Sequence, residues 1–295
     1  MQNPSLQPSP FHELPDAELV TLALAGNSAA LEQVLERQQI WIFNLAFYML
    51  HLREDAEDAT QEVLVKIATN LATFRGESAF RTWARKIAIR HVLDARRSRP
   101  ETVVTGFDCY IDYLDKAADA DVYAERGRTP ETALLVEEAR ISCTLGMLLC
   151  LDREQRLVFL LGEVMETEDS VGAELLEITK DNFRQRLCRA REQLSSFMGG
   201  RCSLMNPKSP CRCAKKTSAF IRDGIVDPER LQFTRGHLEA VSSEAVQSSQ
   251  TLGRLLVESQ GALRPRYPSF EPPTTTHPIA AILNRADVRG ALNLS

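Results

Sequence analysis

The sequence predicts an all-α fold with two small helical domains, an acidic linker between them and a helical C-terminal extension. Two observations support this prediction. From Asp16 to Arg99, and again from Pro130 to Phe197, apolar residues recur at the three- and four-residue spacing of amphipathic helices. Within the first of these blocks no segment alternates between apolar and polar residues, and Gly and Pro, which interrupt helices, are scarce.

The composition is that of a globular protein and argues against several other classes. Of 295 residues, 44% are hydrophobic and 25% are charged, so disorder over the whole chain is not expected. The longest apolar stretch, Ile40 to Leu52, has about 13 residues and is too short to span a membrane, and the N-terminus lacks the pattern of a secretory signal. The seven cysteines are an odd number in a chain of this size, which favours a reducing, cytoplasmic setting.

Changes in composition predict five parts along the chain. They are a Pro-rich flexible tail at 1–15, a helical domain at 16–99, an acidic, irregular linker at 100–133, a second helical domain at 134–197, and an extension at 198–295. We expect Pro100 to close the first helical block and Gly199–Gly200 to end the second. The extension contains a cysteine cluster, a helix candidate near 236–260 and a short final helix candidate.

Three carboxylates form a stripe on the helix expected over residues 55–67. Apolar residues define one side of this helix: Ala56, Ala59, Val63 and Ile67. Asp55, Asp58 and Glu62, which we call the acidic stripe, lie roughly 130° away around the helix axis. A solvated acidic face is the ordinary explanation for such a stripe. The alternative is a docking surface for a basic helix of a partner protein.

The segment 75–99, which we call the basic segment, has eight basic and two acidic residues, a local charge of +6 in a chain whose net charge is -5. This segregation suits a nucleic-acid surface, because phosphate neutralisation and counterion release drive such binding. The expected helix has an apolar stripe formed by Phe80, Trp83, Ala84 and Ile87. Arg81 and Arg85 are expected on the opposite side, and Ser78 as the N-cap. The aromatic residues either stack on unpaired bases or belong to the core.

A helix-turn-helix is predicted over residues 170–196. Its first helix runs from Ser170 to Leu176, and its second from Thr179, as N-cap, to Ser196. The buried side of the second helix is predicted to consist of Phe183, Leu187, Ala190 and Leu194. Its basic residues, Lys180, Arg184, Arg186, Arg189 and Arg191, lie outside that stripe and give a local charge of +4. Asn182, Gln185 and Arg189 could read base edges in a major groove, although an ordinary basic amphipathic helix explains the same pattern.

Three cysteines of the extension, Cys202, Cys211 and Cys213, are spaced C-x8-C-x-C. Zinc takes four such ligands, and His237, Cys188 or water is a candidate for the fourth. The spacing is also redox-competent, and the basic neighbours Arg201, Arg212, Lys215 and Lys216 are expected to lower the pKa of these thiols. The third explanation is three cysteines without a ligand role. Cys109, Cys143 and Cys150 are interpreted as packing or incidental residues.

The order of these segments resembles an extracytoplasmic-function (ECF) sigma factor of bacterial RNA polymerase. The resemblance is carried by DAEDATQEV, FRGESAFRTWARKIAIRHVLDARR, LDREQRLVFLLGEV and FRQRLCRAREQL, with the linker between the second and the third. It covers about residues 25–99 and 134–197. It implies a sigma region-two domain at 16–99, a region-four domain at 134–197, a cytoplasmic location, no enzymatic activity and no required cofactor.

The resemblance implies a role for each surface. The acidic stripe with Gln61 would dock on the clamp helices of the largest polymerase subunit. The promoter −10 element would be recognised by residues of the basic segment, with a flipped base held near residues 74–79: Arg75, Phe80, Arg81, Trp83, Arg85, Lys86 and Arg90. The −35 element would be read by residues of the second helix of the helix-turn-helix: Lys180, Asn182, Arg184, Gln185, Arg186 and Arg189. Residues 151–164 would face the flap of the second-largest subunit, and the linker would run toward the active-site channel.

Three residues depart from the family's usual pattern. Arg90 stands where Asn is frequent, which changes the expected −10 preference. Gly172 replaces an apolar residue and costs about 1 kcal/mol in a helix interior, so the first helix of the helix-turn-helix is expected to be weakly formed. Glu177 occupies the turn position where a left-handed Gly is usual.

The implied partners are core RNA polymerase and promoter DNA, without membrane insertion; the sequence leaves open whether an anti-sigma factor binds as well. The rival function is a stand-alone helix-turn-helix regulator whose C-terminal segment senses metal or redox state. The acidic stripe separates the two functions, because a stand-alone regulator has no need of a polymerase-docking surface.

Overall fold

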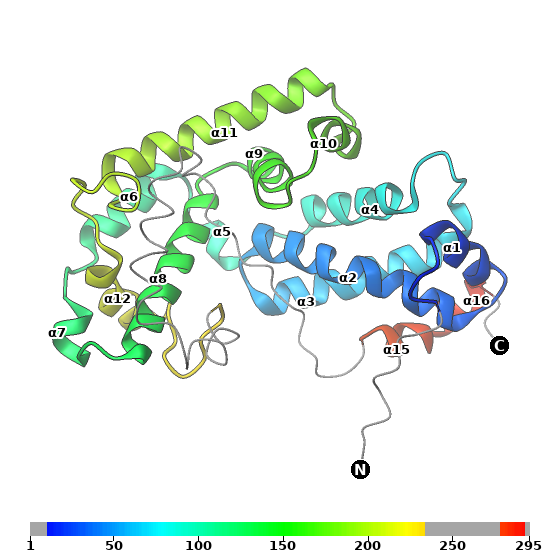
Figure 1. Ribbon diagram of the computed structural model, residues 1–295, viewed down its shortest axis with the longest axis horizontal. Helices are drawn as coiled ribbons and strands as arrows, with labels where there is room; N and C mark the ends of the chain where they lie inside the picture. Colours follow the sequence, from blue (N-terminus) through cyan, green and yellow to red (C-terminus); the bar gives the residue numbers. More distant parts are fainter. Residues whose placement is uncertain (1–10, 234–277, 293–295) are drawn as a thin grey trace, which may run out of the picture. The chain divides into compact units, whose positions relative to one another are not determined.

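The computed structural model describes residues 11–233 and 278–292, and its regular elements in these ranges are helices (Figure 1). The predicted all-α fold class is therefore confirmed. The described chain divides into two compact units. The first contains the residues up to Ser98, the short stretch 174–177 and the C-terminal helices, and the second contains the remainder from Arg99. The helix candidate near 236–260 lies outside the described residues.

The first unit is built around a pair of packed helices. Its elements are α1 (Asp16–Leu24), α2 (Ser28–Leu50), α3 (Arg53–Asn70), the 3-10 turn η1 (Leu71–Thr73) and α4 (Phe80–Asp94). Helix α2 packs along α3, and α4 contacts both. Asn27 caps α2 by accepting a hydrogen bond from the Ala30 N–H, and the helix ends at His51 in the left-handed conformation. Burial of Phe43, Tyr48 and Leu64 between these helices supplies the hydrophobic stabilisation of the unit.

Two short helices close to the C-terminus belong to this first unit. Helices α15 (Pro278–Leu283) and α16 (Ala286–Leu292) pack on α2 and α3, far from them in sequence. The apolar side chains that they bury are Ile279, Ile282, Val288 and Leu292. The final helix expected from the sequence thus corresponds to two helices, and they cover part of the α2–α3 pair.

Among the described residues, the second unit contains seven whole helices and the larger part of an eighth, α10, whose residues 174–176 belong to the first unit. They are α5 (Arg99–Val103), α6 (Phe107–Lys116), α7 (Val122–Arg126), α8 (Pro130–Leu148), α9 (Arg153–Phe159), α10 (Asp169–Leu176), α11 (Lys180–Arg201) and α12 (Cys213–Arg222). A π-helical turn, η2 (Leu160–Val164), follows α9. Helix α8 packs against α6, α7 and α12, and α9 packs against α11.

The range 100–133 is more ordered than the irregular linker expected from its acidic composition. It contains α5, α6 and α7, and the buried residues Tyr110, Leu114 and Val122 anchor it to the second unit. Pro100 does not close a helix; it lies in the first turn of α5, where the missing N–H of proline costs nothing. The apolar residues that order this range are too few and too widely spaced to stand out in a sequence rich in aspartate.

Two further helix boundaries differ from the expectation. Ala79, not Ser78, is the N-cap of α4, and the Ser78 hydroxyl does not cap the helix. Helix α11 continues through Gly199 and Gly200 to Arg201, because its C-terminal turns are held by contacts that the sequence pattern does not reveal. Asn206 and Ser209, from the segment after the helix, both donate side-chain hydrogen bonds to the carbonyl of Gly199.

A buried carboxylate joins α5 to α9. Glu101 accepts hydrogen bonds from Arg153 Nε at 2.9 Å and Nη2 at 2.7 Å, and from Arg156 Nη1 at 3.0 Å. The Glu101 and Arg156 side chains are only 2% and 4% exposed. Arg156 also donates to the carbonyls of Leu148 and Leu151. This network is charge-paired and hydrogen-bonded, as a buried carboxylate requires.

Candidate nucleic-acid and partner-binding surfaces

The acidic stripe lies on α3 as the helical spacing predicts. Its opposite side, formed by Ala56, Ala59, Val63 and Ile67, is buried, whereas Asp58, Gln61 and Glu62 are exposed and Asp55 is half-buried. Across the described residues, Asp55, Asp58 and Gln61 form no ion pair and no side-chain hydrogen bond. Three polar groups in a row on one helix are therefore available to a partner.

Glu62 has a neighbour inside the first unit. Its carboxylate lies 3.7 Å from Nε2 of His91, whose Nδ1 is 2.7 Å from the Lys66 ammonium. Burial of the imidazole, followed by the charge of Lys66, lowers the pKa of His91 below its usual value. At neutral pH the ring is therefore neutral and leaves the charge of Glu62 uncompensated.

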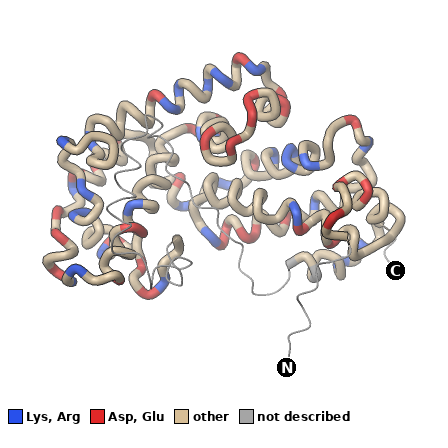
Figure 2. Tube along the Cα trace, viewed as in Figure 1, with Lys and Arg blue, Asp and Glu red and all other residues tan. Residues whose placement is uncertain are grey.

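The basic segment presents its charges from α4 and the loop before it, where Figure 2 shows basic residues in the middle of the helix. Arg75, Arg81 and Arg90 are exposed and Lys86 is half-buried. The buried side of α4 consists of Phe80, Ala84, Ala88, Ile89 and Val92. It differs from the predicted stripe, because Trp83 and Ile87 are only half-buried.

The aromatic residues of this segment form a cluster. The ring centroids of Phe74, Phe80 and Trp83 lie 5.5–5.7 Å from one another. Phe80 is 4% exposed, which favours the core explanation for this residue over base stacking. Trp83 belongs to the same cluster and is half-buried, as Phe74 is, so a base could reach it more easily than Phe80.

Arg85 does not face solvent on the side opposite the apolar stripe, as the helical wheel suggested. Its guanidinium carbon lies 4.5 Å from the centroid of the Trp41 ring, a cation–π contact with α2. Burial, with a smaller contribution from Arg81, lowers the pKa of Arg85 to about 10, so the side chain stays charged at neutral pH. Its Nε has no hydrogen-bond partner among the described residues. Arg85 therefore stabilises the packing of α4 on α2.

The predicted helix-turn-helix corresponds to α10 and α11. Thr179 caps α11 by accepting a hydrogen bond from the Asn182 N–H, and Phe183, Leu187, Ala190 and Leu194 are buried, both as predicted. Glu177 adopts the left-handed conformation at φ 56° that the turn requires. Gly172 does not prevent α10 from forming. A Cβ atom at this position would lie 2.5 Å from Cζ of Phe183, so the glycine permits a close approach between the helices.

The exposed face of α11 carries a basic run that Figure 2 shows along the helix. Several of its arginines pair with carboxylates of the same unit: Arg184 with Asp169 at 2.6 Å, Arg186 with Glu154 at 2.8 Å, and Arg191 with Glu163. Asn182 accepts a hydrogen bond from Arg186. Lys180, Gln185 and Arg189 are exposed and make no such contact with any described residue. These three of the six predicted base-reading residues could therefore contact DNA without first breaking a contact with another described residue.

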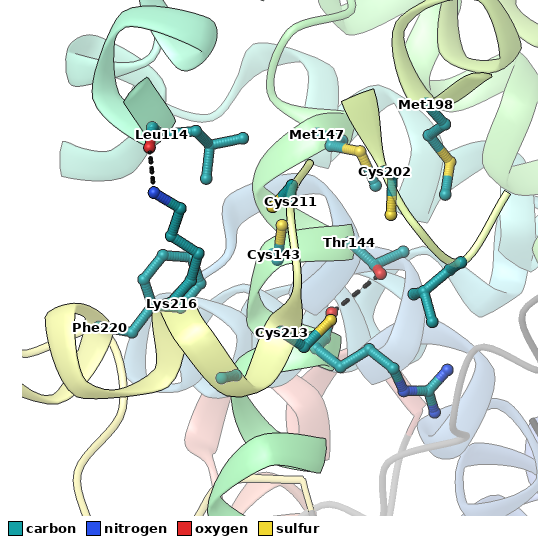
Figure 3. A pocket seen from close by; sticks show the side chains of 13 residues that line it. Leu114, Cys143, Thr144, Met147, Met198, Cys202, Cys211, Cys213, Lys216 and Phe220 are labelled. Atoms are coloured by element: carbon teal, nitrogen blue, oxygen red, sulfur yellow. Dashed lines mark hydrogen bonds between the residues drawn. The ribbon is translucent and has the colours of Figure 1, made fainter. Parts of the chain in front are cut away.

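The three cysteines of the extension do come together, and a fourth joins them. Cys202, Cys211 and Cys213 line one small cavity with Cys143 of α8 (Figure 3). Cys143 is distant in sequence, so spacing gave no signal for it. Cys188 is exposed on α11 and contacts Glu192, and His237 lies outside the described residues.

The expected lowering of the thiol pKa values is wrong. Burial raises the pKa of Cys213 to about 12 and also raises that of Cys211, and neighbouring thiols add to both increases. The basic neighbours oppose this effect without overcoming it. Over the described ranges, no group of three or more His, Cys, Asp or Glu side chains is arranged as a metal-binding set. The helices described here also include none with the length and apolarity to cross a membrane.

Comparisons with known proteins find one matching family model and several sigma factors to which this chain is similar. The family described as Sigma-70 region 2 matches residues 34–101. The ECF RNA polymerase sigma factor SigM of Mycobacterium tuberculosis (strain H37Rv) is 26% identical over 64% of this chain and 87% of its own length. The RNA polymerase sigma-H factor of Pseudomonas aeruginosa is 29% identical, and the match covers 62% of this chain and 93% of that protein. A solved structure of CnrH in complex with the cytosolic domain of CnrY matches with a TM-score of 0.42 and 21% identity. The match covers 62% of this chain and 96% of the chain in that structure.

Proposed function

The chain belongs to the ECF RNA polymerase sigma factors, and on this premise we propose that its three charged surfaces divide promoter recognition between them. Sigma factors direct RNA polymerase to promoters and are regulators of transcription, not enzymes. The family relatives match this chain over most of their own length, 87% for SigM and 93% for sigma-H. A stand-alone helix-turn-helix regulator would not need the region-two domain that these matches include, so that alternative is not favoured.

The acidic stripe is the proposed contact with core polymerase. Asp55, Asp58 and Gln61 are polar groups without a side-chain partner in the described structure, and His91, whose pKa is lowered, is not a cationic partner for Glu62 at neutral pH. A complementary basic surface on the partner would supply both steering and specificity. This uncompensated row of carboxylates is the observation that carries the proposal.

The basic segment is the proposed −10 surface. Arg75 and Arg81 would neutralise phosphates, because they are exposed and belong to a segment with a local charge of +6. Arg90 is also exposed but pairs with Glu177 at 2.7 Å, so it would have to exchange this carboxylate for phosphate. The partly exposed ring of Trp83 would stack on a base released from the duplex. Lys86 would assist from its half-buried position, whereas Phe80 and Arg85 would act through packing, by holding Trp83 and α4 in place.

Helix α11 is the proposed −35 reader. Gln185 and Arg189 are exposed with no described partner, and their amide and guanidinium groups can make paired hydrogen bonds with base edges. Lys180, next to the N-cap, would contact phosphate. Arg184 and Arg186 would have to exchange Asp169 and Glu154 for DNA, so their contribution would be offset by the loss of those ion pairs.

The remaining assignments are also proposals. Residues 100–133 would connect the two domains and, despite their helices, would lie between the DNA-binding surfaces of the holoenzyme. Because the chain would act on polymerase and promoter DNA, we expect it in the cytoplasm. Promoter recognition by these surfaces needs no cofactor, and a zinc ion at Cys202, Cys211 and Cys213 is a separate proposal.

Run-off transcription tests the function. Core polymerase with and without the chain is incubated with fragments of genomic DNA, and transcripts are mapped at their 5′ ends. We expect defined transcripts that require the chain and that share sequence near −10 and −35. Fragments bound by the chain alone, with no new transcript, would support the stand-alone regulator instead.

The division of labour between α4 and α11 predicts two different defects. Arg189→Ala should weaken binding to a −35 duplex by about 1–3 kcal/mol and relax the preference at one base pair, because a base contact is lost. Arg75→Ala with Arg81→Ala should leave that binding intact and reduce promoter opening, measured as permanganate reactivity of thymines near −10. The control is Arg126→Ala, an exposed arginine on α7. Equal loss of affinity for any DNA in both variants would contradict the division.

A further inference from the structure

Four thiol side chains from three separate segments surround one cavity of the second unit. Cys143 lies on α8, Cys202 is the C-cap of α11, Cys211 precedes α12, and Cys213 begins it. The cavity they line is about 20 Å³, room for one ion or one water molecule (Figure 3). All four cysteines are free thiols in the described structure.

The backbone around these thiols is held by bonds that do not involve sulfur. Cys202 and Cys211 form an isolated parallel bridge, in which the Ser203 N–H donates to the Cys211 carbonyl and the Cys211 N–H donates to the Arg201 carbonyl, each at 3.3 Å. The Arg212 guanidinium donates to the carbonyls of Ser209 and Pro207. The loop is therefore held by hydrogen bonds of its own backbone and of Arg212.

Two cations line the same cavity. Arg140 pairs with Glu137, and Lys216 donates to the carbonyls of Leu114 at 2.7 Å and Ala117 at 2.5 Å. Lys216 is 9% exposed, and among the described carboxylates its ion-pair partner is Asp119, at 2.9 Å. The positive charges of Arg140 and Lys216 lie beside the thiols and would stabilise thiolates there once a metal ion displaces the thiol protons.

The four cysteines line the same cavity, so one divalent cation there could draw all four thiols into the thiolate form. The ion would displace the thiol protons, and each thiolate would then face it. Soft sulfur ligands, four in number, suit zinc.

We propose that Cys143, Cys202, Cys211 and Cys213 together bind one Zn²⁺ ion. Binding releases four thiol protons and forms four Zn–S bonds, leaving a site of net charge −2 next to Arg140 and Lys216. In the described structure the four cysteines line the cavity but are not arranged as a metal-binding set, so binding would require their side chains to rearrange. Such an ion would join α8, the end of α11 and the start of α12. The proposal goes beyond promoter recognition and does not depend on it.

Metal analysis of the full-length chain tests the site without polymerase. The chain is stripped of metal under reducing conditions and titrated with Zn²⁺ against a chromophoric chelator, and with Co²⁺ as a spectroscopic probe. We expect one Zn²⁺ per chain, and for Co²⁺ the intense visible bands of a tetrahedral tetrathiolate site. Less than about a tenth of an ion per chain, or a Co²⁺ spectrum without these bands, would overturn the proposal.

The variants Cys143→Ser and Cys188→Ser decide the fourth ligand. Cys143→Ser should weaken zinc binding by about 100-fold or more, since the loss of an outer-shell contact alone costs about 10–100-fold. Cys188→Ser should bind zinc like the parent, because Cys188 is exposed and outside the cavity. Cys143→Ala, with far-ultraviolet circular dichroism on the stripped protein, shows whether the fold is kept. Unchanged affinity in a folded Cys143→Ala chain, or loss in Cys188→Ser, would overturn the assignment. Run-off transcription with the same proteins reports separately on the sigma activity.

Discussion

Replacing Asp55 and Asp58 by Lys should abolish co-purification of the chain with core RNA polymerase while leaving its fold intact. Asp58 is exposed and Asp55 half-buried on α3, and neither has an ion-pair partner among the described residues, so the substitutions break no ion pair there. Two reversals change the surface by four charges. At a complementary interface this replaces attraction by repulsion, which costs several kcal/mol and is sufficient to prevent stable association. The measurement is a pull-down with tagged core polymerase, repeated across a range of salt concentrations.

The matched control is Glu13→Lys with Glu18→Lys. These carboxylates are exposed in the same unit, and Glu18 lies in the first turn of α1 as Asp55 does in the first turn of α3. The two double variants therefore change net charge equally, and each reverses one charge in the first turn of a helix. Only the α3 variant should lose polymerase. Retention of polymerase by both, or loss by both, would show that the acidic stripe is not a specific docking surface.

Much of the fold could be predicted because helix periodicity is a local property. The buried stripes of α3 and α11 and the N-cap of α11 at Thr179 follow from residues a few positions apart. Local patterns could not reveal packing between distant segments. The close approach of Phe183 makes Gly172 necessary where its helix propensity suggested a weakness, and the buried side chains Tyr110 and Val122 order a range that looked like a linker.

Local sequence patterns also fail to predict the contacts of single side chains in the candidate site. A helical wheel places Arg81 and Arg85 together, yet only the structure brings Trp41 over the Arg85 guanidinium. Sequence also counts Arg184 as a free charge, although Asp169 pairs with it. Cys143 is the clearest example, because its relation to the later cysteines exists only in three dimensions.

Replacing Glu101 by Ala should lower the stability of the second unit by about 3–5 kcal/mol. The substitution removes the carboxylate that two arginines share, with Arg156 4% and Arg153 15% exposed, and leaves their buried guanidinium groups without this counter-charge. The two tryptophans, Trp41 and Trp83, both lie in the first unit. In a urea titration, tryptophan fluorescence should therefore follow an unchanged transition, while circular dichroism should show part of the helix signal lost at lower urea.

The comparison variant is Asp112→Ala, which removes a carboxylate from an ion pair on α6 whose partners are 72% and 80% exposed. An exposed pair of this kind contributes at most about 0.5 kcal/mol, so this variant should unfold like the parent. Similar small losses in both variants would show that the buried pair contributes no more than a surface one.

A third variant distinguishes the attraction within the buried ion pair from the cost of its buried charges. If Glu101→Leu, Arg153→Met and Arg156→Met together restore stability, the cost of Glu101→Ala comes from uncompensated buried charge and not from a lost attraction, because well-packed apolar residues often replace buried ion pairs without loss.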